Sequence, residues 1–231
     1  MCTYREQLVP FGLFVVADGM GGHACGQEAS RIAIRTLAQS ALRDIMQPET
    51  LDDKQLIELL ARAVEQANNA IYQRGQEWNK DMGTTLTAAL IVDTKTSVMA
   101  YVVNAGDSRT YLLGAGEPLQ QITRDHSLVA NLVAAGAITP DAVYEHPERN
   151  KIYRSLGNNA SIDIDWFTRE LRSGDILLLC ADGLGEMVRD PEIERILRQP
   201  DEPTALCNQL IQSALKGGGA DNISAVVVRI S

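Results

Sequence analysis

The sequence predicts an α+β fold in which antiparallel β-sheets are covered by helices. Two observations lead to this prediction. Apolar residues first recur at helical spacing, and the period then changes to short β-type runs joined by tight connections. Tight connections join antiparallel strands, because parallel strands need long crossovers. Further helical segments near the C-terminus would cover these sheets, since a sheet must bury its apolar face against another layer.

The N-terminal third is expected to contain one strand and two long helices. The apolar run 13–17 is typical of a buried strand, and residues 18–22 that follow are too rich in glycine to continue it. Helical spacing indicates a first helix over about residues 26–46. Asp52 or Asp53 can cap a second long helix. Its inner face is expected to consist of Leu56, Leu59, Leu60, Ala63, Val64, Ala67 and Ile71.

The middle of the chain changes to β-type periodicity. The connections 93–96 and 105–107 have the size of hairpin turns, so we expect antiparallel pairing along this series. A short helix is expected over residues 126–135. Residues 136–159 are rich in turn-forming and polar side chains and are expected to form a flap. The strands predicted in this part cover residues 84–92, 97–104, 109–113 and 119–122.

The C-terminal third is expected to return to mixed structure within the same domain, so that residues 1–231 form a single unit. Two strands, two helices and a closing strand are predicted, because alternating and helical periods follow one another there. These elements cover residues 162–170, 175–180, 191–198, 204–215 and 222–230.

Composition limits the function. The 231 residues carry a net charge of −9, with 30 acidic and 21 basic side chains, whereas a broad nucleic-acid surface requires a basic excess. No apolar run reaches membrane-spanning length, and the N-terminus lacks a signal-peptide pattern. Four cysteines without a Cys-x-x-Cys pair are typical of reduced thiols. We therefore expect a cytoplasmic protein that binds neither nucleic acid nor membrane.

Four aspartates occur in turns where strands begin or end. Residues 16–21 (VADGMG) recur in outline as residues 180–185 (CADGLG), and each copy places an aspartate, Asp18 or Asp182, after an apolar strand. Asp221 stands before the final strand, and Asp107 lies in a turn. Carboxylates at strand ends can converge while their strands stay in the core.

Converging carboxylates repel one another unless cations lie among them, and hard oxygen ligands suit Mg²⁺ or Mn²⁺. The glycines beside them let the backbone bend, and would let a carbonyl such as that of Gly19 approach an ion. The alternative is that these aspartates are ordinary turn residues, because Asp-Gly is common in turns.

Six segments in order along nearly the whole chain resemble the metal-dependent serine/threonine protein phosphatases of type 2C, including bacterial members. One such motif would be weak evidence, whereas six in the family's order are specific. The segments are 14–23 (FVVADGMGGH), 82–86 (MGTTL), 104–109 (NAGDSR), 123–127 (TRDHS), 179–184 (LCADGL) and 219–224 (GADNIS).

The resemblance implies an α-β-β-α sandwich, with two antiparallel sheets packed face to face and flanked by helices. It also implies a centre of two, or three, Mn²⁺ or Mg²⁺ ions. By residue match, Asp18 would bridge two ions, and Asp182 and Asp221 would hold one of them. Gly19 would offer its carbonyl to the other, and Asp107 with Asp182 would match a weaker third position.

The activity implied by the resemblance is hydrolysis of phosphoserine and phosphothreonine in proteins by a metal-bridging hydroxide. Its partners would be phosphorylated proteins, such as a kinase or a regulator. We hypothesise that His23, beside the metal site, protonates the leaving oxygen as a general acid. The alternative is a loop histidine that bonds the backbone.

The N-terminus departs from the family pattern. Family members carry an earlier strand with a phosphate-binding arginine and an Asn-Glu-Asp segment, and residues 1–11 contain Arg5 and Glu6 without that pattern. We assign neither role to these two residues. Either the start is truncated, or the domain is a reduced, weakly active or inactive binding module. A missing strand would expose a sheet edge, which favours dimerisation. A phosphatase of a partner-switching regulator would share the same motifs.

Overall fold

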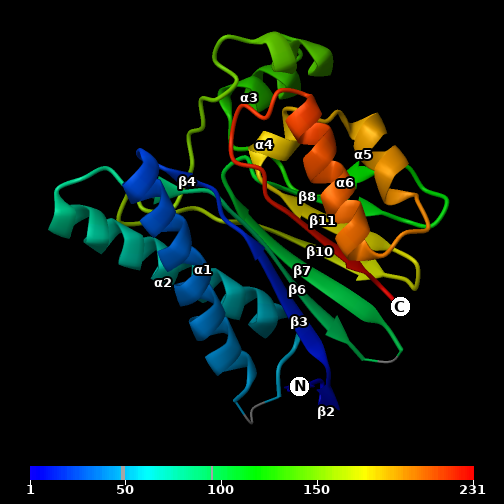
Figure 1. The fold of residues 1–231 in the computed structure, drawn as a ribbon. Helices are drawn as coiled ribbons and strands as arrows, with labels where there is room; N and C mark the ends of the chain where they lie inside the picture. Colours follow the sequence, from blue (N-terminus) through cyan, green and yellow to red (C-terminus); the bar gives the residue numbers. More distant parts are fainter. Residues whose placement is uncertain (48–49, 95) are drawn as a thin grey trace.

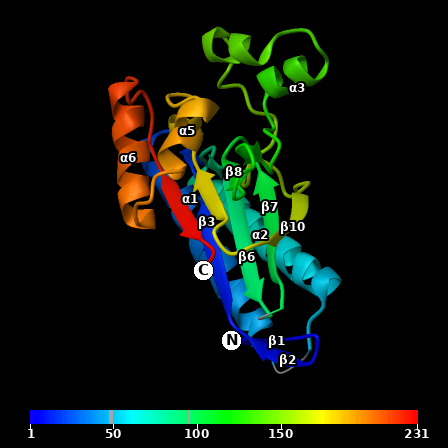
Figure 2. The same ribbon diagram turned by 90° about the vertical axis from the view of Figure 1, so that its right-hand side faces the viewer.

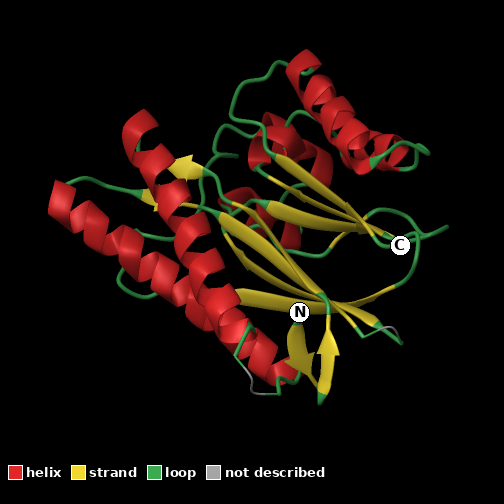
Figure 3. Cartoon of the chain, turned by 60° about the horizontal axis from the view of Figure 1, so that its bottom comes forward, coloured by secondary structure: helices red, strands yellow, loops and turns green. Residues whose placement is uncertain are grey.

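The computed structural model describes residues 1–47, 50–94 and 96–231 and contains four layers (Figure 1). Two antiparallel four-stranded sheets pack face to face, and helices cover the outer face of each sheet (Figure 3). The predicted α-β-β-α sandwich is therefore confirmed.

The first sheet has the strand order β10-β7-β6-β3. Its strands are β3 (Phe11–Val16), β6 (Leu86–Asp93), β7 (Val98–Ala105) and β10 (Asp165–Leu171). Side chains on one face, such as Leu90 and Tyr101, pack under α1 (His23–Ile45) and α2 (Asp53–Trp78). Alternate residues, such as Ile91 and Ala100, face the second sheet. Both faces of the central strands β6 and β7 are buried, so these two strands are apolar at most positions, whereas the edge strand β10 carries polar residues such as Arg169 and Glu170.

The second sheet has the strand order β12-β11-β8-β9. Its strands are β8 (Arg109–Leu113), β9 (Gln120–Gln121), β11 (Ile176–Cys180) and β12 (Ala225–Arg229). Leu178 packs against the outer helices, and Leu177 and Leu179 fill the space between the sheets. The outer helices are α4 (Asp182–Gly185), α5 (Asp190–Leu197) and α6 (Pro203–Lys216).

The second long helix begins where the sequence predicts. Asp52 is the N-cap residue, and its side chain accepts a hydrogen bond from the backbone N–H of Gln55 at 2.8 Å. The Gln55 side chain accepts one in return from the Asp52 N–H at 2.9 Å. This reciprocal capping box satisfies two N–H groups that a helix terminus otherwise leaves free. The first helix starts at His23, three residues earlier than expected.

The prediction of a hairpin at residues 105–107 is wrong. β7 pairs with β6 and β10, whereas β8 pairs with β11 and β9, so the chain passes from one sheet to the other at this point. Gly106 makes the corner with φ 115°. Hydroxyl pairs join the two sheets beside it, namely Thr85 to Ser108 and Thr87 to Thr110, each at 2.7 Å. Turn length alone could not distinguish a hairpin from such a corner.

A short hairpin at the N-terminus was not predicted. β1 (Cys2–Tyr4) and β2 (Gln7–Val9) pair beside the start of β3, at the end of the molecule opposite α3 (Leu128–Ala134) (Figure 2). Arg5 and Glu6 form its turn with φ 45° and 66°, a conformation usually left to glycine. Asp53 secures the hairpin because it accepts hydrogen bonds from the Tyr4 hydroxyl and from Arg5.

We expect Gly106→Ala to destabilise the protein by about 2–4 kcal/mol. The substitution strains a positive φ and also places a Cβ 2.6 Å from the Thr85 Cβ. Gly116→Ala is the matched control, because its φ is 79° but no atom lies within 4 Å of an added Cβ. Urea unfolding of both variants measures the difference, and equal losses would contradict the packing role of the corner.

Candidate metal centre

The strand register brings the predicted aspartates to one end of the sandwich. In the second sheet, Cys180 at the end of β11 pairs with both Ala225 at the start of β12 and Arg109 at the start of β8. Asp182 comes shortly after Cys180, and Asp221 lies shortly before Ala225. The same sheet edge therefore carries both carboxylates.

The first sheet supplies Asp18 at the matching end. Val16, at the end of β3, pairs with Thr87 near the start of β6, and Ala105 at the end of β7 pairs with Leu86. Asp18 thus follows β3 close to the Gly106 corner. Asp107, in this corner, stands where the two sheets meet and is 8% exposed.

Asp18 lies near enough to Asp182 for the two carboxyl groups to influence each other. Burial first, and then the neighbouring Asp182 carboxyl and the charges of Asp221 and Asp107, raise the pKa of Asp18 to about 8. Burial, followed by the charges of Asp182 and Asp125, raises the pKa of Asp107 to about 7. Burial is the largest cause of both shifts, and the charges of neighbouring carboxylates add to it.

The donor set fits hard divalent cations. Oδ1 of Asp182 is buried and has no hydrogen-bond partner among the described residues. A buried carboxylate oxygen without a partner is costly unless a cation or water contacts it. Carboxylate and carbonyl oxygens are the ligands that Mg²⁺ and Mn²⁺ prefer.

The carboxylates nevertheless stand apart. In the part of the chain that the structure describes, no group of three acidic, histidine or cysteine side chains is drawn together tightly enough to hold an ion. Asp18, Gly19 and Asp221 line one cavity of about 520 Å³. Asp107 and Asp182 line a second, narrow cavity of about 30 Å³.

Two glycines fix the backbone beside Asp18. A Cβ on Gly19 would lie 1.9 Å from the carbonyl oxygen of Gly26 in α1, and a Cβ on Gly26 would lie 2.5 Å from the carbonyl oxygen of Gly19. The first turns of α1 therefore pack directly on the loop after β3. This contact places the N-terminus of α1 at the wall of the 520 Å³ cavity, which Gly22 and Gly26 also line.

His23, Arg5 and Glu6 were also named from the sequence, and these three residues lie at different places relative to the four aspartates. His23 is the first residue of α1, and its side chain lies outside the described residues, so the general-acid role stays a prediction. Arg5 and Glu6 occupy the β1–β2 turn at the opposite end of β3 from Asp18. Arg5 pairs there with Asp53 at 2.7 Å. Neither Arg5 nor Glu6 reaches the carboxylates.

Sequence reasoning missed an ion pair in the narrow cavity. Arg149 and Glu186 line it together with Asp107 and Asp182, and Nε of Arg149 lies 3.3 Å from Oε2 of Glu186. Arg149 is thus a cation close to the carboxylates. It occurs in an irregular segment without periodicity, so no spacing signal could have identified it.

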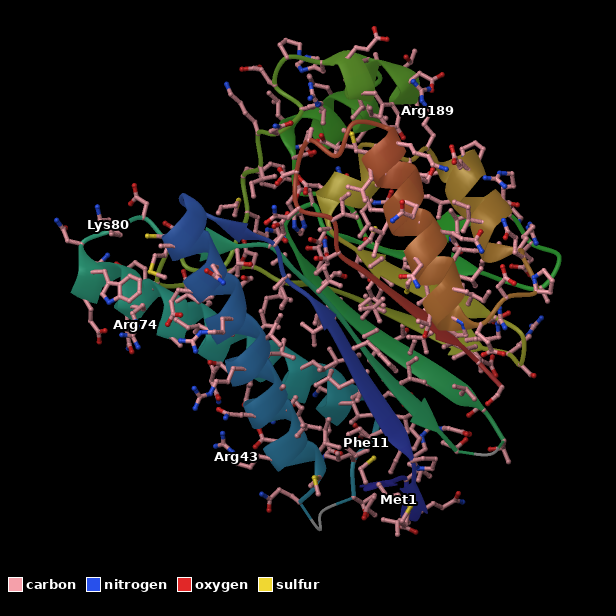
Figure 4. The ribbon with its side chains drawn as sticks, viewed as in Figure 1. Met1, Phe11, Arg43, Arg74, Lys80 and Arg189 are labelled. Carbon is pink, nitrogen blue, oxygen red and sulfur yellow. The ribbon has the colours of Figure 1, made fainter. Side chains whose placement is uncertain are left out.

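Residues 128–154 form a lobe above the ends of the sheets, with α3 (Leu128–Ala134) and the 3₁₀ helix η1 (Pro140–Glu145) (Figures 1 and 2). We call this segment the α3–η1 lobe. Arg189 joins it to the helices below: its Nη1 lies 3.0 Å from Oδ1 of Asp141, and its guanidinium stacks 4.6 Å from the centre of the Tyr144 ring (Figure 4).

His126 fastens the base of the lobe. Its Nδ1 accepts a hydrogen bond from the Gly106 N–H at 3.0 Å, and its Nε2 lies 3.1 Å from Oδ2 of Asp165. Burial lowers the pKa of His126. Arg154, at the end of the lobe, binds Oδ1 of Asp165 at 2.6 Å. His126 is therefore a structural residue that ties the lobe to the corner carrying Asp107.

Comparison with known proteins agrees with this geometry. The family model "Protein phosphatase 2C" matches residues 6–211. The serine/threonine protein phosphatase PstP of Mycobacterium tuberculosis is 40% identical over 225 residues, which cover 94% of this chain and 40% of that protein. The serine/threonine phosphatase Stp of Listeria monocytogenes is 35% identical over 220 residues, covering 94% and 83%.

A solved structure extends the comparison to three dimensions. The catalytic domain of PstP in complex with two manganese ions superposes with a TM-score of 0.80 at 38% identity, covering 97% of this chain and 91% of that one. The chain spans only 40% of the length of full mycobacterial PstP.

The raised pKa of Asp18 predicts a pH effect on stability in the presence of a chelator. From about pH 4 to about pH 8 the folded state holds a proton on Asp18 that the unfolded chain has lost. The contribution of this group to stability therefore falls as the pH rises through that window. We expect the difference in free energy of unfolding between Asp18→Asn and the wild type to shift in favour of the variant by about 1–2 kcal/mol over this pH range. This value is smaller than the full pKa shift would give, because Asp18 is partly exposed and solvent screens its interactions.

Thermal and urea unfolding in EDTA at several pH values measure this gain. Asp81→Asn, at an exposed position, is the control for removing a carboxylate on the surface. A constant difference between Asp18→Asn and the wild type would contradict the repulsion between the carboxylates.

Proposed function

From the premise that the chain belongs to the protein phosphatase 2C family, we propose that it is a metal-dependent phosphatase acting on phosphoserine and phosphothreonine in proteins. The observation that carries this proposal is the convergence of carboxylates from both sheets at one end of the sandwich. Asp18 follows a strand of the first sheet and Asp182 follows a strand of the second, and the Asp182 carboxyl is close enough to contribute to the raised pKa of Asp18. A fold that gathers acids in this way requires cations to offset their repulsion.

The metal ligands in this proposal are Asp18, Gly19, Asp107, Asp182 and Asp221, for two or three Mn²⁺ or Mg²⁺ ions. When bound, such ions lower the pKa of water and neutralise phosphoryl oxygens. The residues of this chain position the reaction around them. Asp18 reaches the site from the first sheet, and Asp182 and Asp221 reach it from the second.

The phosphoryl group would enter through the 520 Å³ cavity. Asp18 and Asp221 line this cavity on one side, and the N-terminal turns of α1 line it on the other. The N-terminus of a helix favours anions, because free N–H groups and the helix dipole face them. The cavity therefore combines metal ligands with a wall that tolerates phosphate. His23, at the first position of α1, remains the proposed general acid for the leaving oxygen.

Residues 136–159 act as a flap over the centre, within a single domain covering residues 1–231. The lobe that contains most of this segment stands above the carboxylates, and its position depends on a few contacts with Glu186, Asp165 and Arg189. These ion pairs are partly exposed and individually weak. Substrate proteins, including a kinase or a regulator in signalling, would meet this lobe first.

The location we propose is the cytoplasm, where phosphorylated regulators occur. Among the described residues, no helix has the length and apolarity needed to cross a bilayer. The net charge of −9 lacks the basic excess that a broad nucleic-acid surface needs, so the proposal includes no nucleic-acid partner.

Asp182→Asn should lower kcat on a phosphothreonine peptide by about 100-fold or more in the presence of Mn²⁺. The variant keeps the shape of the side chain but removes the charge of a residue that would hold one ion together with Asp221 and the weaker third ion together with Asp107. Asp81→Asn is the matched control on the surface. Turnover that survives Asp182→Asn, or that does not require a divalent cation, would contradict the proposed centre.

The open edge of the first sheet should allow dimerisation. Within the described strands, β3 pairs with β6 alone, and its residues Phe11 to Val15 are all partly exposed. β12, the edge strand of the other sheet, lies beside it. Unprotected apolar edges pair with other strands. We expect sedimentation velocity to detect a concentration-dependent dimer, and a monomer at all concentrations would contradict this proposal.

A further inference from the structure

The buried residue Thr85 holds the main chain at Asp18, the first of the proposed metal ligands. Thr85 lies between β5 (Gly83–Thr84) and β6. Its Oγ1 accepts a hydrogen bond from the Asp18 N–H at 3.2 Å, and its own N–H donates to the Asp18 carbonyl oxygen at 2.8 Å. Both backbone groups of Asp18 are therefore held by one residue, which leaves the Asp18 side chain to face the other carboxylates.

The hydroxyl of Thr85 also reaches the corner that carries Asp107. Oγ1 of Thr85 and Oγ of Ser108 lie 2.7 Å apart, and Ser108 directly follows Asp107 in the chain. A hydroxyl has one proton and two lone pairs, so Thr85 can accept from the Asp18 N–H and bond Ser108 at the same time. One buried oxygen thus joins the main chain at Asp18 to the residue beside Asp107.

A second pair of hydroxyl groups shows what joining the sheets requires by itself. Thr87 and Thr110 are buried in the same way, with 2.7 Å between their Oγ1 atoms. In the described part of the chain these two hydroxyls bond each other and neither of them bonds an aspartate. Joining the sheets therefore requires no contact with a residue that carries a carboxylate, and the bond from Asp18 to Thr85 is an additional feature.

We propose that Thr85 is a positioning residue for the metal centre, whose hydroxyl fixes the spacing between Asp18 and Asp107 and thereby the affinity for divalent cations. This inference rests on the proposed phosphatase function and adds to its metal ligands a residue that acts through them. Carboxylates that repel one another bind a common ion more tightly when their main chains are already fixed, because binding then orders less of the chain. Groups that orient metal ligands typically change metal affinity or activity by about 10–100-fold.

Thr85→Val tests the proposal, because valine keeps the shape of threonine and lacks the hydroxyl. We expect the dissociation constant for Mn²⁺, measured by isothermal titration calorimetry without substrate, to rise about tenfold or more. Thr85→Ser restores a hydroxyl and should stay within about threefold of the wild type. Thr87→Val is the matched control and should stay within about twofold, because it breaks a similar hydroxyl pair that does not bond Asp18.

Urea unfolding in EDTA separates metal binding from folding. We expect both Thr85→Val and Thr87→Val to lower the midpoint of unfolding, because each leaves a buried hydroxyl without its partner. An equal loss of Mn²⁺ affinity in these two variants would overturn the proposal, since the hydroxyl pairs would then serve packing alone. Unchanged affinity in Thr85→Val would overturn it too, as would a loss in Thr85→Ser as large as that in Thr85→Val.

Ser108→Ala breaks the same hydroxyl pair from the side of Asp107 and keeps the bond between Asp18 and Thr85. We expect the Mn²⁺ dissociation constant of this variant to rise by about threefold to tenfold, whereas Thr110→Val, its counterpart in the other pair, should leave the constant unchanged. Equal effects of these two substitutions would contradict the inference. A wild-type chain that binds no Mn²⁺ would refute the proposed metal centre itself, whereas wild-type binding that Thr85→Val does not weaken would refute this inference alone.

Discussion

Electrostatic repulsion between carboxylates is the constraint on which the rest of this structure depends. The charges of Asp18, Asp107, Asp182 and Asp221 oppose folding when they are brought together in a buried place, and burial together with these charges raises the pKa values of Asp18 and Asp107. Asp18 and Asp182 follow strand ends, Asp107 lies in the corner between the sheets, and Asp221 lies in the loop that leads into β12, so the apolar core holds most of these charges in position. The favourable packing of the core thus offsets the free energy that gathering these carboxylates costs.

The same constraint explains the architecture around the site. The sandwich gives two sheet edges that meet at one end, and one polar group from each sheet can approach the other there without leaving its own strand. The corner at Gly106 places Asp107 at this meeting line. His126 then links the corner to the lobe through Gly106 and Asp165. The position of the lobe and the position of one carboxylate are therefore mechanically connected.

Much of the fold and of the site could be predicted from the sequence, and the failures have physical causes. Strands such as β11 and helices such as α2 were found because periodicity and capping are local properties, and the family motifs mark the aspartates themselves. The corner at residues 105–107 was mistaken for a hairpin, because strand pairing is decided by distant partners such as β10 and β11. The β1–β2 hairpin was missed since Arg5 and Glu6 are unusual in its turn. The Arg149–Glu186 pair depends on tertiary packing alone.

The interleaved order of the strands has a consequence for synthesis on the ribosome. The chain completes three strands of the first sheet by Ala105, but β11 and β12, which cover the inner face of that sheet, begin only at Ile176 and Ala225. The inner side chains of Ala89, Ile91 and Val102 lack many of their partners until then, because the contacts from β11 and β12 are still missing. The nascent chain therefore presents a wide apolar face for the time needed to make about half of its length, a period of roughly 6–24 seconds at typical elongation rates of about 5–20 residues per second. The emerging protein is most exposed to chaperones and to misassociation in this interval.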